Sequence, residues 1–109
     1  KECFTPAVRR RLVTLLRRLE YGIAPEENAA ALWRLYFEEG IFPEYLLDFA
    51  AQTIVHQAEL LRLLLQTAEP PLAQELAGAA QRKLSGEAVQ EALRQFAARR
   101  QKGGAMDER

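Results

Sequence analysis

Five arginines stand within eleven residues of this chain, in the segment VRRRLVTLLRR from Val8 to Arg18. On a helix of 3.6 residues per turn, Arg10, Arg11, Arg17 and Arg18 share one face, opposite a stripe of leucines. Guanidinium groups carry planar forks of donors that suit phosphate and carboxylate oxygens. These four residues, here called the arginine strip, therefore predict contact with a polyanion or an acidic partner.

Three interpretations of the arginine strip stay open from the sequence. The arginines can be a solvated face or pair with acidic residues of the next helix, they can dock on an acidic protein, or they can follow a nucleic-acid backbone. In the last case a second basic cluster would assist them, formed by Arg99, Arg100 and Lys102. Clustered positive charge suffices for phosphate binding, and the chain has no RNP motif or zinc finger. We expect a protein contact before nucleic acid, because seven acidic residues from Glu20 to Asp48 would repel a long polyanion.

Side chains that could carry catalysis are few and scattered. His56 is the only histidine and Cys3 the only cysteine, and no Glu-x-x-His pair completes a metal site. The acidic pairs Glu26–Glu27 and Glu38–Glu39 are neighbours in sequence, so their side chains point about 100° apart on a helix and form no carboxylate dyad. No P-loop or nucleophile elbow is present. The sequence predicts a protein that is not an enzyme, with no catalytic residue, metal, cofactor or small-molecule substrate.

Aromatic side chains gather in one part of the chain, where six of the nine lie between Trp33 and Phe49. Large rings at a corner between two helices can lock a helical hairpin, which is one interpretation. The other is that they present anchors or a pocket to an amphipathic helix of another chain. The candidates for such an interface are four of these aromatic residues and two leucines of the following helix, namely Trp33, Phe37, Phe42, Tyr45, Leu61 and Leu65.

The elements that must position these residues are all helical, because apolar residues recur at the helical period and prolines and glycines separate the segments. Thr5 is the expected cap of the first helix and Ser85 that of the last. The fold class predicted is all-α, a compact bundle of about five helices with one long central helix. The expected ranges are 6–21, 25–39, 43–68, 72–84 and 86–102.

The long central helix over about residues 43–68 has apolar residues around well over half of its circumference. Four short neighbours cannot cover so much apolar surface, and we therefore expect self-association or a tight contact with a protein partner.

Length and composition predict a single helical domain over residues 1–102 and a disordered C-terminal tail over 103–109, which begins with Gly103 and Gly104. No apolar run is long enough to span a bilayer, and the single cysteine suits a reducing, cytoplasmic setting. The function that these features favour is a non-catalytic protein–protein interaction module, a small subunit or adaptor of a larger complex. The alternative hypothesis is a helical subunit that binds a nucleic-acid backbone through the arginine strip.

Overall fold

The computed structural model describes the backbone of residues 5–107 and the side chains of residues 5–99. Over that range the chain forms six helices and no strand, so the predicted all-α class is confirmed. The helices are α1 (Pro6–Glu20), α2 (Pro25–Glu39), α3 (Pro43–Thr53), α4 (Gln57–Thr67), α5 (Pro70–Lys83) and α6 (Glu87–Asp107). Cys3 lies outside the described residues.

The helix starts follow from local sequence chemistry. Proline opens α1, α2, α3 and α5, where its missing N–H costs nothing because the first turn of a helix has no acceptor for it. Thr5 caps α1 as predicted, with its Oγ1 accepting a hydrogen bond from the backbone nitrogen of Val8 at 3.1 Å. Gly40 ends α2 with a φ of 68°, the left-handed conformation that glycine adopts without strain.

The predicted long helix over residues 43–68 is wrong in one respect, because the chain breaks it into α3 and α4. Ile54, between them, has an extended backbone with φ −102° and ψ 126°. It belongs to a run of three β-branched residues, Thr53 to Val55, whose side chains lose rotamer freedom in a helix. In addition, the Glu20 carboxylate accepts hydrogen bonds from the backbone nitrogens of Val55 and His56, which gives these amides a partner outside a continuous helix. Apolar periodicity alone reveals neither effect.

Leucines from α1 to α6 form the core, and the largest fully buried ones are Leu12, Leu16, Leu19, Leu32, Leu35, Leu46, Leu47, Leu60, Leu61, Leu64 and Leu76. The helix α3 packs its apolar face against α5, and α4 packs against α1, α2, α5 and α6. Along these two helices and the break between them, only Val55 is a large hydrophobic residue that stands mostly exposed, at 75%. The expected excess of apolar surface on this segment is therefore not present, and it gives no argument for self-association.

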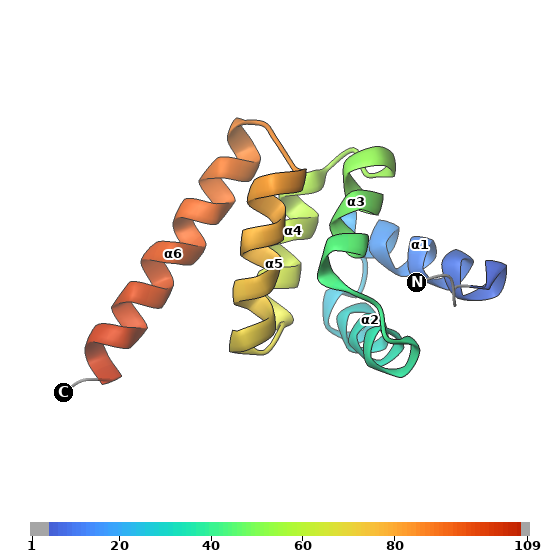
Figure 1. The fold of residues 1–109 in the computed structure, drawn as a ribbon, viewed down its shortest axis with the longest axis horizontal. Helices are drawn as coiled ribbons and strands as arrows, with labels where there is room; N and C mark the ends of the chain where they lie inside the picture. Colours follow the sequence, from blue (N-terminus) through green and yellow to red (C-terminus); the bar gives the residue numbers. More distant parts are fainter. Residues whose placement is uncertain (1–4, 108–109) are drawn as a thin grey trace.

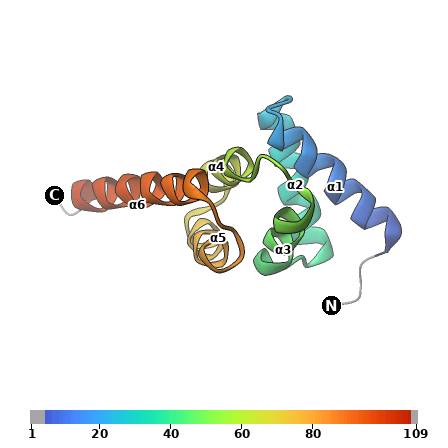
Figure 2. The same cartoon turned by 90° about the horizontal axis from the view of Figure 1, so that it is seen from above.

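The helices are arranged so that α3, α4 and α5 run side by side, with α1 and α2 at one end of the molecule and α6 at the other (Figures 1 and 2). The first half of α6 packs on α4 and α5 and buries Val89, Ala92 and Leu93, and its second half extends away from the body. The helix continues to Asp107, past the end that the two glycines predict. Residues 108–109 lie outside the described part, and the domain boundary at 102 stays a prediction.

Tyr36 gives the fold a predictable response to alkaline pH. Burial, and then the negative charge of Glu75, raise the pKa of the Tyr36 phenol to about 12, whereas a tyrosine in an unfolded chain ionises near pH 10. The stability that this group contributes is complete below pH 10 and is lost as the pH rises towards 12, by about 1.4 kcal/mol at pH 11. Urea unfolding at pH 9 and pH 11 should therefore show a smaller alkaline loss in Tyr36→Phe than in the parent. Equal losses in the two proteins would contradict this assignment.

Candidate functional site

The structure gives two members of the arginine strip structural partners. Arg17 donates from Nη2 to the carbonyl oxygen of Thr53 at 3.2 Å, at the C-terminal end of α3, where carbonyls lack helical partners and a positive charge is favourable. Arg18 donates from Nη1 to Oδ1 of Asn28 at 3.4 Å, which links α1 to α2. Both arginines thus help to hold α1 against its neighbours.

The other two members, Arg10 and Arg11, are exposed and make no hydrogen bond or ion pair with another described residue. Arg99, the first residue of the second basic cluster, is exposed on α6. Because α1 and α6 lie at opposite ends of the molecule, Arg99 and the arginine strip do not form one surface (Figure 1). The side chains of Arg100 and Lys102 lie outside the described residues.

Two acidic residues of α3 pair with α5 and not with the arginine strip. Arg82 forms an ion pair with Glu44, and Lys83 forms one with Asp48 at 3.0 Å, so both pairs join α5 to α3. Among the described side chains, no ion pair connects α1 to α2. The arginine strip therefore forms no ion pair with the described acidic residues of α2. That pairing was one of the interpretations left open by the sequence.

Two of the aromatic residues that were predicted to form an interface are partly buried in the fold. Trp33 and Tyr45 are half-buried against the core. The indole nitrogen of Trp33 donates to Oγ1 of Thr67 at 2.9 Å, and its ring meets that of Tyr36 edge to face with centroids 5.3 Å apart. Trp33 therefore connects α2 to α4.

The four remaining candidates for the interface differ in exposure, because two of them are exposed and two are buried. Phe37 and Phe42 are each 62% exposed, although large apolar side chains are normally covered in a folded chain. Leu61 and Leu65 lie in the core, at 1% and 7% exposed, so they offer no surface for docking. The structure thus reduces the predicted set to two exposed aromatic rings at the corner between α2 and α3, of which that of Phe37 meets the Tyr36 ring edge to face.

A groove of about 430 Å³ lies beside Phe42, between the start of α3 and the middle of α5. Its lining, here called the Phe42 groove, consists of Phe42, Pro43, Glu44, Glu75, Gly78, Ala79 and Arg82. The small residues Gly78 and Ala79 let another molecule approach the α5 backbone closely, while the ring of Phe42 supplies an apolar wall. The two carboxylates make part of the rim acidic, although Arg82 pairs with Glu44.

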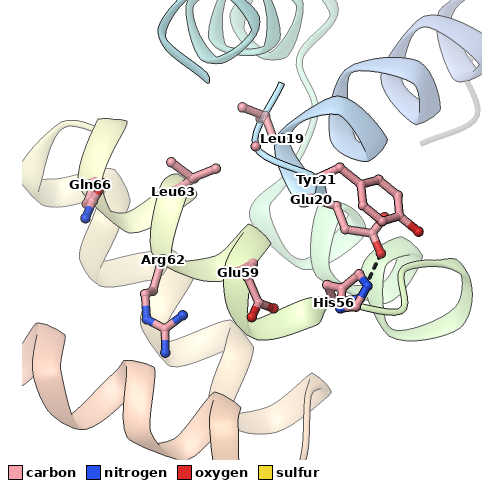
Figure 3. Close-up of a pocket in the computed structure, with 9 residues that line it drawn as sticks. Leu19, Glu20, Tyr21, His56, Glu59, Arg62, Leu63 and Gln66 are labelled. Atoms are coloured by element: carbon pink, nitrogen blue, oxygen red, sulfur yellow. Dashed lines mark hydrogen bonds between the residues drawn. The ribbon is translucent and has the colours of Figure 1, made fainter. Parts of the chain in front are cut away.

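A second groove, of about 520 Å³, lies between the C-terminal end of α1 and one face of α4 (Figure 3). Its lining, here called the Glu20 groove, consists of Leu19, Glu20, Tyr21, Gly22, His56, Glu59, Arg62, Leu63 and Gln66. Glu20 is only 3% exposed. Its Oε2 accepts hydrogen bonds from the backbone nitrogens of Val55 at 2.9 Å and His56 at 2.8 Å, so it caps the start of α4 from outside the helix.

Sequence reasoning missed Glu20, which it counted only as one of seven acidic residues. A signal was present, because Glu20 follows Leu16 by four residues and therefore falls on the apolar stripe of α1 rather than on its charged face. A carboxylate at such a position needs a hydrogen-bonding partner, since burial of an unpaired charge is costly. His56, expected within a long helix beside polar residues, instead lies at the helix break, where its ring meets that of Tyr21 edge to face at 5.3 Å.

Comparison with known proteins adds no further constraint on the site. No family model matches the chain, and no curated protein or solved structure was found to be similar to it. Within the described residues, no three or more His, Cys, Asp and Glu side chains gather where they could hold a metal ion. None of the helices described is both long enough and apolar enough to cross a membrane.

Proposed function

We propose that this chain is a non-catalytic helical interaction module that acts as a small subunit or adaptor of a larger complex and docks another protein at the Phe42 groove. The observation that supports this most directly is the exposure of Phe42, 62%, beside a groove floored by Gly78 and Ala79. Aromatic rings next to a pocket are typical anchors of protein interfaces.

The chemistry of the groove favours a particular partner. Its apolar wall and small floor suit one large apolar side chain, such as a leucine or phenylalanine, carried on a helix of the partner. Glu75 lies on the rim and has no ion pair with another described residue, and the exposed Glu38 lies at the nearby end of α2. A basic residue next to the apolar anchor would complement these carboxylates.

We do not extend the proposal to nucleic acid. Two of the four arginines of the strip bind groups within the chain, and the second basic cluster begins at the other end of the molecule. Within the strip, Arg10 and Arg11 are the exposed arginines without a partner among the described residues, so fewer unpaired charges are available for the several phosphate contacts that nucleic-acid binding uses.

A photo-cross-linking amino acid placed at position 42 tests the proposed surface in cells that naturally produce the protein. Position 98, an exposed alanine on α6, is the matched control. We expect one protein to be captured from position 42 and not from position 98. The purified partner should then bind the parent chain, and Phe42→Ala should weaken that binding at least about tenfold, as expected for an aromatic anchor.

Val55→Ala is the control for this measurement, because Val55 is exposed and apolar but lies outside the Phe42 groove. It should leave the affinity within about twofold of the parent value. Equal capture from positions 42 and 98, or equal weakening by the two substitutions, would overturn the proposal.

A further inference from the structure

One oxygen of the Glu20 carboxylate is buried without a hydrogen-bond partner among the described residues. This oxygen is Oε1, whereas Oε2 accepts two backbone hydrogen bonds. A buried acceptor without a partner costs about 1–3 kcal/mol, and more when it is charged, so proteins rarely retain one without a reason. Since Glu20 lines a groove of about 520 Å³, within the volume range of small-molecule sites, a donor from a ligand can supply the missing bond.

Several features around Oε1 favour a ligand that is positively charged. Glu20 lies in the last turn of α1, where the end of the helix dipole favours a cation, while Oε2 already meets the positive start of α4. The carboxylate of Glu59 lines the same groove and makes no ion pair with another described residue. The ring of Tyr21, 57% exposed, offers an aromatic face to a cation.

Arg62 and His56 are the basic side chains in the groove lining. In Figure 3 the guanidinium of Arg62 points away from Glu20, towards α6. His56 presents its backbone nitrogen to Glu20 and its ring to Tyr21. The Glu20 end of the groove therefore keeps its negative character.

We propose that the Glu20 groove binds an alkylammonium ion, the charged form of a primary amine, with an N–H donating to Oε1 of Glu20. The alkyl chain would lie against Leu19 and Leu63, the apolar residues of the lining. Figure 3 places the carboxylate between the side chains of Tyr21 and His56. Because Oε1 is buried, the proposal requires the exposed Tyr21 side chain to move away from the carboxylate when the amine binds. This site is separate from the Phe42 groove and does not depend on the function proposed there.

Titration of the ¹⁵N-labelled protein with pentylammonium chloride, followed by NMR, tests the proposal. The amide signals of Val55 and His56 report on the site directly, because both amides donate to Glu20. We expect these signals to shift and saturate at millimolar pentylammonium. Pentanol has the same chain without the charge, and tetramethylammonium has the charge without an N–H, so both should bind at least about tenfold more weakly.

Glu20→Gln is the matched variant, since it keeps an oxygen for the two amides while replacing the charged acceptor with an amide. We expect it to weaken pentylammonium binding at least about tenfold. Glu38→Gln, which removes an exposed carboxylate on α2 outside the groove, should leave binding unchanged. Should Glu20→Gln not fold, Glu59→Gln replaces it, with an expected loss of about two- to fivefold because this carboxylate is exposed.

The same titration distinguishes the sources of the amine. Tighter binding of Nα-acetyl-lysine amide than of pentylammonium would identify a lysine side chain of a protein as the ligand, whereas equal or weaker binding would identify a free amine. The absence of saturable shifts with both probes would overturn the proposal. Unchanged affinity in Glu20→Gln, or in Glu59→Gln if that variant is the one measured, would overturn it as well.

Discussion

Replacing Leu61 by alanine is expected to lower the free energy of unfolding by about 2–5 kcal/mol. Leu61 is 1% exposed and lies on α4, which packs against α1, α2, α5 and α6. Neighbours on several helices hold the space around its side chain, so the structure cannot collapse fully into the cavity that alanine leaves. Urea unfolding followed by circular dichroism measures the loss.

Val55→Ala is the matched control, because it also shortens an apolar side chain, in this case one that is 75% exposed. Its effect should stay within about 0.5 kcal/mol. Because Leu61 was predicted from the sequence as an interface residue, both measurements should be repeated at several protein concentrations. A parent midpoint that rises with concentration, and a Leu61→Ala midpoint that does not, would place Leu61 in an interface and contradict the core assignment.

The helical class could be predicted because its signals are local. Pro6, Pro25 and Pro43 each begin a helix where the sequence indicated, and Gly40 ends one. The division of the expected long helix into α3 and α4 depends partly on Glu20, which reaches the break from 35 residues earlier in the chain. Such a contact exists only after α1 has packed against α4, and periodicity within residues 43–68 cannot reveal it.

The candidate surfaces were harder to predict, because residue type does not fix exposure. Phe37 and Leu65 are both large and apolar, yet one is 62% exposed and the other 7%. Similarly, Arg10 and Arg17 share a helix face in the sequence pattern, but the carbonyl that Arg17 binds belongs to α3. The packing of distant helices decides which member of each pair remains available to a partner.

The Glu20 carboxylate accepts both hydrogen bonds at the helix break, and its removal should have a large effect on stability. Glu20→Ala is expected to lower the free energy of unfolding by about 2–3 kcal/mol, because the backbone nitrogens of Val55 and His56 lose their acceptor and α4 loses a negative charge at its start.

Glu20→Gln removes the negative charge of the side chain but keeps an oxygen that can accept hydrogen bonds. Its amide oxygen can still accept from both nitrogens, and removal of a buried charge with one unpaired oxygen offsets the weaker hydrogen bonds. We therefore expect Glu20→Gln to stay within about 1 kcal/mol of the parent. Urea unfolding gives both values, and hydrogen exchange at the Val55 and His56 amides locates the effect, since exchange should accelerate at these two positions in Glu20→Ala alone. Equal destabilisation by the two substitutions would mean that the charge of Glu20, rather than its position as an acceptor, holds α1 to the start of α4.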